Sequence, residues 1–473
     1  MNIVPPELEK ILRETPELKQ AYLVGGCVRD AILGIPHKDF DIEVFGIGYE
    51  ELADSLSRWG RADLVGRSFG VVKLRHGDFE FDFSIPRRDT KTAPGHKGFD
   101  VKFDGAISPK EAANRRDFTI NALMFDPREN NVLDFFNGRA DLQNKILRHT
   151  SDAFPEDPLR VLRGMQFASR FELQPAPETL ALCRQIKSTY PELAVERVRE
   201  EWFKWAEKSR APSIGLKFLA ATEWIDHFPE LKAMMGTPQE PEWHPEGDVF
   251  IHTCHCCDAL VKLPAWQNGD GESRIVYSLA VLLHDTGKAV TTHKQNEDGK
   301  TRIVSPGHEN EGVPIAEKFL DRIACPNDIR ARVLPLIQNH MAHMQTVTER
   351  SVRRLAKRLE PENIEGLCTV ITADAMGRPP KPQIVPRMVN ELREKASELK
   401  VHSSAPKPIL MGRHLIEFGL EPGKQFGDIL AAAYEAQLEG TFSNYEEALH
   451  WLRKENFDLP ENVREKLKMW SQS

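Results

Sequence analysis

Long hydrophobic runs are missing from this sequence of 473 residues. No stretch approaches the roughly 18 apolar residues that a membrane-spanning helix requires, which argues against a helical membrane protein. The first residues, MNIVPPELEKILRETPEL, carry prolines and acids where a signal peptide needs positive charge followed by an apolar stretch. We therefore expect a cytoplasmic protein without membrane contact.

Cysteines are few, and their number, seven, is odd. Three of them are crowded into CHCC at 254–257, within about one helical turn. This pattern excludes a disulfide framework. Cys254, Cys256 and Cys257 beside His255 could bind zinc, but no second cluster completes four ligands. The pattern favours reduced, buried thiols and leaves zinc as the alternative.

An excess of positive charge is also missing, since the formal net charge is −8. This balance argues against non-specific coating of nucleic acid, but it allows a nucleic-acid enzyme whose basic residues gather in one groove. Hydrophobic residues make up 40% and charged residues 28% of the chain, which is typical of folded proteins. At about 100–200 residues per domain, the length predicts several domains in series.

The pattern of apolar residues changes near residue 150. Before it, short apolar or alternating segments such as AYLV, FDIEVFG, GVVKL and FEFDFSI predict a mixed sheet with helices. Beyond it the pattern is helical, and two proline-rich stretches, 236–248 and 402–408, interrupt it. We expect an α+β protein with domains at 1–145, 146–238, 239–400 and 401–473.

Two aspartates, Asp39 and Asp41, alternate with apolar residues on one predicted strand. Both carboxylates then project from one face, about 7 Å apart, where they can bind one or two divalent ions. Mg²⁺ is the natural choice, because it also takes phosphate oxygens as ligands. Gly25 and Gly26 allow a polyphosphate to approach the backbone at the start of a helix. The alternative is a plain strand-turn-helix with surface aspartates.

The segment EDPLRVLRGMQFASRF, 156–171, predicts a helix with Asp157 as its cap and proline at its first position. Three guanidinium groups and one ring share a narrow arc of this helix: Arg160, Arg163, Phe167 and Arg170. A carboxylate and a guanidinium together can recognise the edge of a base. Helix capping alone would also explain Asp157.

Histidines and aspartates recur after residue 240, in IHT, LLHDTGK, GHE, NHMAH and TADAMGR. The residues concerned are His252, His284, Asp285, His308, His340 and Asp374. Imidazole and carboxylate together suit a transition metal such as Ni²⁺, Mn²⁺ or Fe²⁺. We expect a metal site here, with His255 and His343 as structural histidines.

Four stretches together resemble one family over residues 20–210: YLVGGCVRDAILGIPHKDFDIEVFG, RRDFTINAL, DFFNGRADL and EDPLRVLRGMQFASRF. The family is that of class II tRNA nucleotidyltransferases and bacterial poly(A) polymerases. The resemblance implies a polymerase-beta-like nucleotidyltransferase head followed by an all-α neck. It implies nucleotide binding by Gly25, Gly26, Arg29, Arg116, Asp117, Asn121, Asp157, Arg160 and Arg163. It also implies catalytic metal ions at Asp39 and Asp41 that activate an RNA 3′-hydroxyl.

Further positions follow from this resemblance. Asp82 is the candidate for a third carboxylate, with a solvated strand face as the alternative. The turn DFFNGRADL would couple movements of head and neck, and Asp134 and Asp141 within it are given no chemical step. The segment VERVREEWFKW, 195–205, would support the neck.

The choice within the family depends on short stretches. Arg67 is followed by Ser68, whereas poly(A) polymerases usually carry two adjacent basic residues here, so the sequence favours a CCA-adding enzyme that uses CTP, ATP and tRNA. The polar segment 86–108 resembles the flexible loop of such enzymes and predicts a lever that adapts the pocket from cytosine to adenine. A poly(A) polymerase, or an enzyme that adds only CC or only A, is the alternative.

The later histidine set resembles the HD phosphohydrolase family. This implies His252, His284, Asp285 and Asp374 as metal ligands, with His308 and His340 for a second metal or a phosphate. Some tRNA nucleotidyltransferases carry this module and act as 2′,3′-cyclic phosphodiesterases, 2′-nucleotidases or phosphatases. Residues 408–454 resemble the RNA-gripping tail of the class II enzymes. A protein uridylyltransferase also joins two such blocks, but it would lack RRDFTINAL and EDPLR. A monomer and a homodimer are both open.

Overall fold

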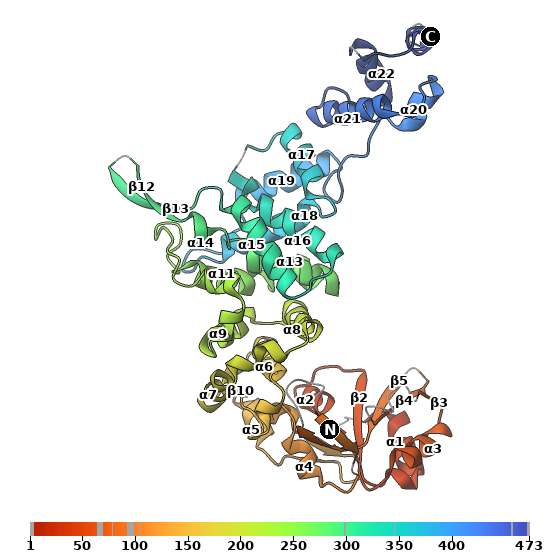
Figure 1. Ribbon diagram of the computed structural model, residues 1–473, viewed down its shortest axis with the longest axis vertical. Coiled ribbons are helices and arrows are strands. Elements are labelled where there is room, and N and C mark those ends of the chain that lie inside the picture. Colours follow the sequence, from red (N-terminus) through yellow and green to blue (C-terminus); the bar gives the residue numbers. More distant parts are fainter. Residues whose placement is uncertain are drawn as a thin grey trace. The chain divides into compact units, whose positions relative to one another are not determined.

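The computed structural model describes residues 4–63, 70–77, 79–91, 99–103, 105–297, 299–344, 346–455 and 457–470. The chain divides into two compact units, Met1–Pro229 and Glu230–Ser473. Among the described residues, no helix is both long and apolar enough to cross a membrane. The predicted α+β class is confirmed, since the first unit contains a mixed sheet and helices dominate the second (Figure 1).

A seven-stranded sheet lies at the centre of the first unit, in the order β3-β4-β5-β2-β1-β8-β9. Its strands are β1 (Ala21–Val24), β2 (Asp39–Val44), β3 (Arg61–Asp63), β4 (Val71–His76), β5 (Phe79–Ser84), β8 (Met124–Asp126) and β9 (Asn131–Leu133). Neighbours are antiparallel except β2 and β5, which are parallel. Alternate apolar residues of the strands pack into one hydrophobic core with α1 (Pro6–Glu14) and α3 (Tyr49–Ser57).

The segment 86–108, which resembles a flexible loop of the family, contains a hairpin. Strands β6 (Arg87–Lys91) and β7 (Phe99–Phe103) pair antiparallel, which leaves the predicted flexibility untested. The alternation of apolar and polar residues in FDVKF is the local signal for the second strand. Residues 92–98 of this segment lie outside the described residues, as do Arg67 and Ser68, and the lever predicted for 86–108 stays a prediction.

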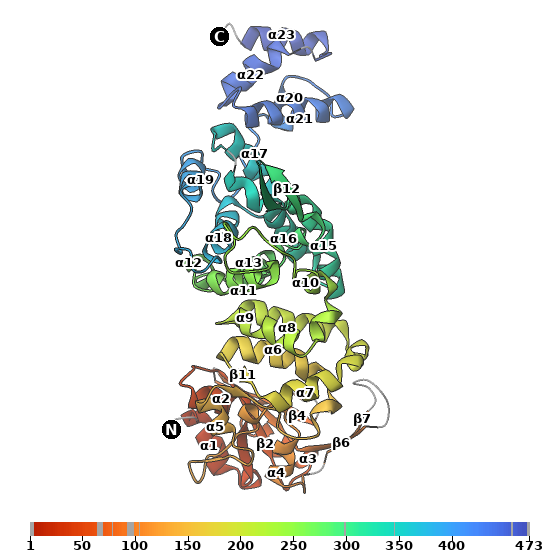
Figure 2. The same cartoon turned by 90° about the vertical axis from the view of Figure 1, so that its left-hand side faces the viewer.

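Of the α-helices after β7 in the first unit, the first precedes β8, and the others follow the last strand of the sheet (Figure 2). They are α4 (Pro109–Asn114), α5 (Gly138–Gln143), α6 (Leu159–Phe171), α7 (Pro177–Gln185), α8 (Val195–Lys208) and α9 (Pro212–Ala221). Close contact of α6 with α9 depends on Gly215, where a Cβ would lie 2.2 Å from Ser169 Oγ and 2.5 Å from Met165 O. The Gly215 amide donates a hydrogen bond to Ser169 Oγ at 3.0 Å, which fixes the two helices against each other.

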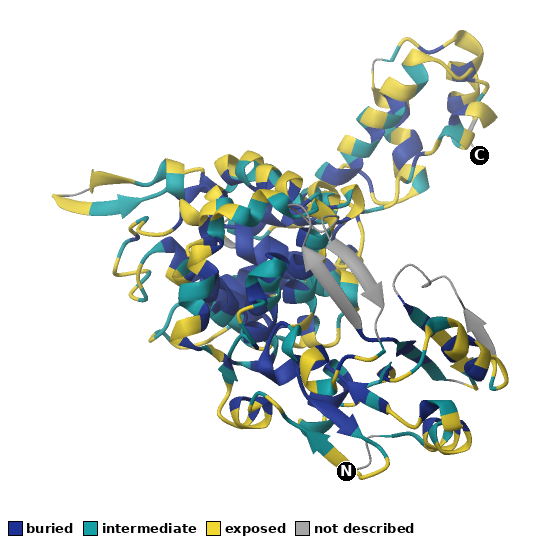
Figure 3. Cartoon of the chain, turned by 60° about the horizontal axis from the view of Figure 1, so that its bottom comes forward, coloured by how far each residue is buried: buried dark blue, intermediate teal, exposed yellow. Residues whose placement is uncertain are grey.

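The second unit is a helical bundle. Its larger helices before residue 400 are α11 (Val249–Leu260), α13 (Gly271–Leu283), α15 (His308–Arg322), α16 (Asn327–Asn339), α17 (Glu349–Leu359), α18 (Ile364–Met376) and α19 (Arg387–Glu398). Its shorter elements are α12 (Pro264–Gln267), α14 (Lys288–Thr291) and the hairpin β12 (His293–Glu297) with β13 (Lys300–Val304). Figure 3 shows buried residues, in dark blue, gathered inside the bundle.

The last helices, α20 (Gly412–Glu417), α21 (Lys424–Glu439), α22 (Tyr445–Lys454) and α23 (Glu461–Trp470), share a hydrophobic cluster of their own that runs from Leu410 to Leu467. Arg354 of α17 and Glu435 of α21 form an ion pair at 3.4 Å. The four predicted domains stay a prediction, because the contacts resolve only the two units.

Gly215→Ala should destabilise the first unit. The added methyl would meet a backbone carbonyl and a hydroxyl of α6, and overpacking of this kind typically costs about 1–3 kcal/mol. Gly427→Ala on exposed α21 is the matched control, because a Cβ there meets nothing within 4 Å beyond its own helix backbone and chain neighbours. Alanine at that site should be neutral or stabilise by up to about 1 kcal/mol. Urea unfolding followed by circular dichroism compares the two variants, and a wild-type midpoint for Gly215→Ala would contradict the close packing.

Candidate functional site

Three aspartates gather where β2 lies beside β5. The parallel register pairs Asp41 with Asp82 and Asp39 with Glu80. The phenylalanines that alternate with them are buried in the core, so the acidic side chains project from the opposite face. Paired positions on adjacent strands lie about 5 Å apart, which puts Asp82 directly beside Asp41.

The negative charges of this group are not fully balanced by positively charged side chains. Lys73 Nζ lies 3.1 Å from Asp82 Oδ2, but Asp82 Oδ1 is buried and makes no hydrogen bond. The Asp41 side chain is exposed to solvent, but protein atoms surround part of its carboxylate. This partial desolvation raises the pKa of Asp41. Arg116 opposes this rise, whereas Asp82 and Asp39 add to it. A divalent cation would neutralise this excess and bind the unpaired oxygen, so the residues fit such an ion.

Gly25 makes the sharp turn from β1 into α2 (Gly26–Ile32). Its φ of 72° lies in a region that side chains rarely adopt, and a Cβ there would come 2.7 Å from Arg116 Nη1. At Gly26 a Cβ would meet only Arg29 Nη2, at an ordinary 3.6 Å. The backbone therefore requires glycine at position 25, and the guanidinium groups of Arg29 and Arg116 lie beside this turn.

A chain of hydrogen bonds joins α2, the short helix η3 (Thr119–Asn121) and α6. Arg29 Nη1 donates to Asn121 Oδ1, and Asn121 Nδ2 donates to Asp117 Oδ1 at 3.0 Å. Arg163 Nε donates to Asp117 Oδ2 at 2.7 Å. Burial alone would raise the pKa of Asp117, but Arg163 and Asn121 outweigh it and hold this pKa below its ordinary value. The ionised carboxylate keeps these side chains in fixed orientations.

Both predicted base-selecting residues already have partners. Helix α6 begins at Leu159 with Pro158 as its N-cap, one residue later than predicted. Asp157 Oδ1 still accepts a hydrogen bond at 3.1 Å from the Leu159 amide, and its Oδ2 lies 2.9 Å from Arg197 Nη2 of α8. Arg160 donates to the carbonyls of Ala153 at 2.7 Å and Arg115 at 2.6 Å. Arg197 has no distinctive signal in the sequence, because it stands in a run of alternating charges.

These residues line one open cleft of about 430 Å³. Its lining comprises Gly25, Gly26, Arg29, Asp41, Arg116, Asp117, Asn121, Asp157, Arg160, Arg163, Phe167 and Arg197. Of the residues predicted for this site, Asp39 and Asp82 lie outside the lining. Arginines outnumber aspartates in it by five to three, and the cleft therefore favours anionic groups such as phosphates.

The turn DFFNGRADL braces η3 from behind the cleft. Asp134 accepts hydrogen bonds from the amides of Gly138 at 2.8 Å and Arg139 at 2.9 Å. A Cβ at Gly138 would lie 2.1 Å from Thr119 O, and Thr119 Oγ1 donates to Asp141 Oδ2 at 2.7 Å. Asp134 therefore holds backbone in place, Asp141 holds the Thr119 side chain, and neither lines the cleft.

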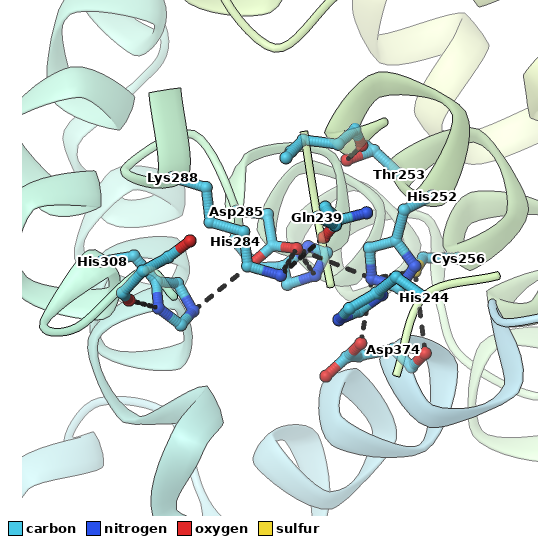
Figure 4. Close-up of polar contacts among 12 residues, drawn as sticks. Gln239, His244, His252, Thr253, Cys256, His284, Asp285, Lys288, His308 and Asp374 are labelled. Carbon is cyan, nitrogen blue, oxygen red and sulfur yellow. Dashed lines mark hydrogen bonds and ion pairs between the residues drawn. The ribbon is translucent and has the colours of Figure 1, made fainter. Parts of the chain in front are cut away.

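The second unit brings four predicted ligands together in its interior (Figure 4). His252 Nε2, on α11, lies 3.0 Å from Asp374 Oδ1 of α18 and 3.6 Å from Asp285 Oδ2. His284 Nε2, just after α13, lies 3.3 Å from Asp285 Oδ2. All four side chains are buried, and imidazoles converging with carboxylates form a set of donors that a divalent metal could join.

Three histidines are oriented by the same kind of hydrogen bond to the backbone. The Nδ1 atoms of His284, His308 and His340 lie 2.7, 2.8 and 2.7 Å from the carbonyl oxygen three residues earlier in the chain. A carbonyl can only accept, so each Nδ1 carries a proton, and Nε2 presents its lone pair wherever the ring is neutral. His284 Nε2 is buried without a hydrogen bond, which suits a metal ligand.

His308 and His340 face the other oxygen of Asp285. Their Nε2 atoms lie 3.3 and 3.8 Å from Asp285 Oδ1 and 3.1 Å from each other. Burial, with His284 nearby, lowers the pKa of His340 to about 3, so this imidazole is neutral. Asp285 can thus face one set of histidines with each oxygen. His255 is half-buried on α11, and the His343 side chain lies outside the described residues.

Further polar groups support this cluster from outside it. Glu246 Oε1 lies 2.7 Å from His252 Nδ1 and 2.9 Å from His244 Nδ1. Lys288 Nζ lies 2.7 Å from Asp285 Oδ2, and Arg378 Nη2 lies 2.7 Å from Asp374 Oδ1. The spacings of three and four residues after an aspartate are helical signals for Lys288 and Arg378. Glu246 belongs to the proline-rich stretch 236–248, whose composition suggests only a boundary.

The cysteines agree with the sequence-based prediction of unbridged thiols. All seven are buried and form no disulfide. Cys256 Sγ lies 3.3 Å from His252 Nε2, at the edge of the histidine cluster.

Comparison with known proteins gives two family matches. Residues 21–148 match the Poly A polymerase head domain, and residues 253–375 match the HD domain. A multifunctional CCA protein of Hahella chejuensis is 36% identical over 372 residues, or 76% of this chain and 82% of that protein. Its counterpart in Teredinibacter turnerae is 33% identical over 375 residues, or 76% of this chain and 84% of that protein. The Bacillus stearothermophilus CCA-adding enzyme in complex with CTP shares the fold, with 19% identity, a TM-score of 0.61 and coverage of 99% of this chain and 100% of its own.

Asp41→Asn should stabilise the metal-free protein at neutral pH. Because the pKa of Asp41 is raised in the folded state, its ionised form is less favourable there than in the unfolded chain. This loss of folding free energy is absent below the pKa of Asp41 in the unfolded chain, about 3.9, and is complete once the pH has risen through its pKa in the folded state. Asparagine removes the charge with little change of volume. Melting temperatures in the presence of a chelator test this: the variant should exceed wild type at neutral pH by a margin that shrinks in acid, and a lower value at neutral pH would contradict it.

Proposed function

Because this chain belongs to the family of multifunctional CCA proteins, we propose that it adds CCA to the 3′ end of tRNA, from CTP and ATP, in the cleft of the first unit. The observation that carries the proposal is the cleft itself, which gathers a glycine turn, an arginine cluster and Asp41. Nucleotidyl transfer requires a cradle for the triphosphate, a group that selects the base, and carboxylates for metal ions. The cleft contains residues suited to each of these tasks.

A nucleotidyltransferase head and an HD domain both imply divalent metals. In the head we assign Mg²⁺ to Asp39 and Asp41, with Asp82 as a third carboxylate, and the unpaired Asp82 oxygen supports this assignment. Bound there, two such ions would lower the pKa of the RNA 3′-hydroxyl and neutralise the departing pyrophosphate. The protein's own contribution is to hold these carboxylates on one face through the pairing of β2 with β5.

The triphosphate and ribose are assigned to the arginine-rich side of the cleft. Arg29 and Arg116 flank the Gly25 turn and would form charge-assisted hydrogen bonds to phosphate oxygens. Asp117 already orients Arg163 and Asn121 through its two carboxylate oxygens. Groups that are fixed before binding lose little conformational freedom when the nucleotide arrives, which favours tight and uniform placement.

Base selection is assigned to Asp157 and Arg160. A carboxylate accepts from the exocyclic amine that cytosine and adenine share, and a guanidinium donates to a ring nitrogen or a carbonyl. Uracil and guanine lack this edge pattern. In the free protein Arg197 holds Asp157 and two carbonyls hold Arg160. Binding would therefore exchange these partners for the base edge, and only a matching edge repays the exchange.

The second unit is proposed as a metal-dependent phosphohydrolase with 2′,3′-cyclic phosphodiesterase, 2′-nucleotidase or phosphatase activity. His252, His284, Asp285 and Asp374 would hold the metal, and His308 with His340 would serve a second ion or a phosphate. An imidazole-rich set supports Ni²⁺, Mn²⁺ or Fe²⁺ over Mg²⁺. A metal bound there would supply an activated water for attack on phosphorus.

The alternatives are a poly(A) polymerase and enzymes that add only CC or only A. All would use the same cleft, so the products decide between them. Transfer onto tRNA that lacks its CCA end, with each triphosphate alone and then with CTP and ATP together, separates the cases. Complete CCA ends support the proposal; adenosine runs on tRNA or ends that stop at CC would replace it with one of the alternatives.

Substitutions in the two units should separate the two activities. Asp41→Asn should lower nucleotide addition by orders of magnitude, because it removes a charge needed for metal binding, and it should spare phosphohydrolysis. His284→Ala should have the opposite effect. Both activities are measured on each purified variant after circular dichroism has confirmed folding. Near wild-type addition by Asp41→Asn, or loss of both activities in one folded variant, would contradict the assignment of separate sites.

Arg160→Ala should reduce discrimination among nucleotides more than affinity for tRNA. One contact to a base edge provides about 1–3 kcal/mol of selectivity, which corresponds to roughly 5–150-fold. Relative incorporation of the four triphosphates measures this, with Arg184→Ala as the control, because Arg184 is exposed on α7 and does not line the cleft. Unchanged selectivity with weaker tRNA binding would move Arg160 from the nucleotide pocket to the RNA surface.

A further inference from the structure

We propose that Cys256 is a sulfur ligand of the metal in the second unit, together with His252, His284 and Asp374. The proposal rests on the metal-dependent phosphohydrolase assigned to this unit. Cys256 follows His252 by four residues on α11, so both side chains lie on the same face of the helix. Its Sγ is 3.3 Å from His252 Nε2 and 3.8 Å from the backbone carbonyl of Asp374.

The donor atoms converge in one place. One ligand atom each from His252, Cys256, His284 and Asp374 lies within 4.8 Å of the other three, and all four residues are buried. Atoms that share a metal at bond lengths of about 2.0–2.3 Å lie at most about 4.6 Å apart. The 4.8 Å bound on the distances between these donor atoms is close to that maximum. Small shifts would therefore bring the sulfur and its three neighbours onto one metal ion.

An unpartnered group points independently to a ligand at this position. His284 Nε2 is buried and accepts no hydrogen bond, while His284 Nδ1 is used by the Val281 carbonyl. A buried imidazole nitrogen that makes no hydrogen bond loses free energy unless it has another partner. A cation held jointly with the sulfur would provide that partner.

Close packing of α11 against the end of α18 determines where the sulfur lies. A Cβ at Gly377 would lie 2.4 Å from Cys256 Sγ and 2.8 Å from Cys256 N, so any larger residue at 377 would displace the thiol. Gly377 O also lies 3.2 Å from His252 Nδ1. The same glycine therefore supports the positions of both the imidazole and the sulfur.

Other cysteines of the same helix provide an internal contrast. Cys254 and Cys257 are equally buried on α11, yet among the described residues neither belongs to a group of potential ligands. The position of Cys256, and not the crowding of cysteines as such, singles it out. Any zinc set built from the three clustered cysteines is disfavoured by the same observation.

Sulfur changes which metal the centre prefers. Thiolate is a soft donor that favours zinc, iron, cobalt or nickel over magnesium. Binding would replace the S–H bond of Cys256 by a sulfur–metal bond and release the thiol proton to solvent. The expected centre is thus a mixed sulfur, nitrogen and oxygen site.

Cobalt(II) as a spectroscopic probe tests the proposal on the full chain. Cobalt-loaded wild type should show a near-ultraviolet thiolate-to-cobalt band in addition to the visible ligand-field bands. Cys254→Ser and Cys257→Ser should keep the near-ultraviolet band. Cys256→Ser should lose it while keeping visible bands, and its cobalt affinity should fall by at least the roughly 10–100-fold that loss of an outer-shell partner costs.

The outcomes separate this inference from the proposed function. His284→Ala identifies which visible bands come from this centre. If those bands are present in wild type without a near-ultraviolet band, sulfur ligation is wrong and the metal centre stands. If no band depends on His284, the proposed phosphohydrolase centre itself is wrong. X-ray absorption of zinc-loaded wild type needs no variant: a zinc–sulfur distance near 2.3 Å supports the proposal, and a shell of nitrogen and oxygen alone near 2.0–2.1 Å overturns it.

Discussion

The parallel pairing of β2 with β5 is the interaction on which the head depends. It places Asp82 beside Asp41 although a different strand supplies each residue. Side chains alternate along a strand, so a slip of one position would turn the aspartates into the core and the phenylalanines into the cleft. Burial of Phe40 and Phe81 therefore determines the register of the carboxylates. The hydrophobic core and the charge of the cleft are two results of one alignment.

The second unit depends on local geometry in a comparable way. An apolar bundle normally excludes charged groups, because an unpaired buried charge raises the free energy of the fold. Here each imidazole that faces Asp285 from His284, His308 and His340 is oriented by the carbonyl three residues before it. Lys288 compensates the carboxylate from outside. The histidines of the cluster are thus oriented by hydrogen bonds to carbonyls close to them in sequence.

Local signals in the sequence are enough to predict much of this molecule. Alternating residues identify β2 and β5, the glycine pair marks the turn into α2, and Asp157 before proline predicts the start of α6. The family resemblance, and not these patterns, gives Arg29, Arg116, Asp117 and Asn121 of the cleft lining. Neither gives Arg197 or Glu246, because each acquires its role only through a contact distant in sequence: Arg197 with Asp157, and Glu246 with His244 and His252. A proline-rich composition also conceals Glu246, since it resembles that of a linker.

The DFFNGRADL turn does not readily accept inserted or deleted residues. Surface loops usually tolerate inserted or deleted residues. In this one, Asp134 accepts from two backbone amides, Gly138 lies against Thr119 O, and Asp141 accepts from the Thr119 hydroxyl, so the contacts fix the number of residues between positions 134 and 141. One added residue would break this match and shift η3, which carries Asn121 into the cleft. Insertions and deletions are therefore expected to be better tolerated in other surface loops than in this turn.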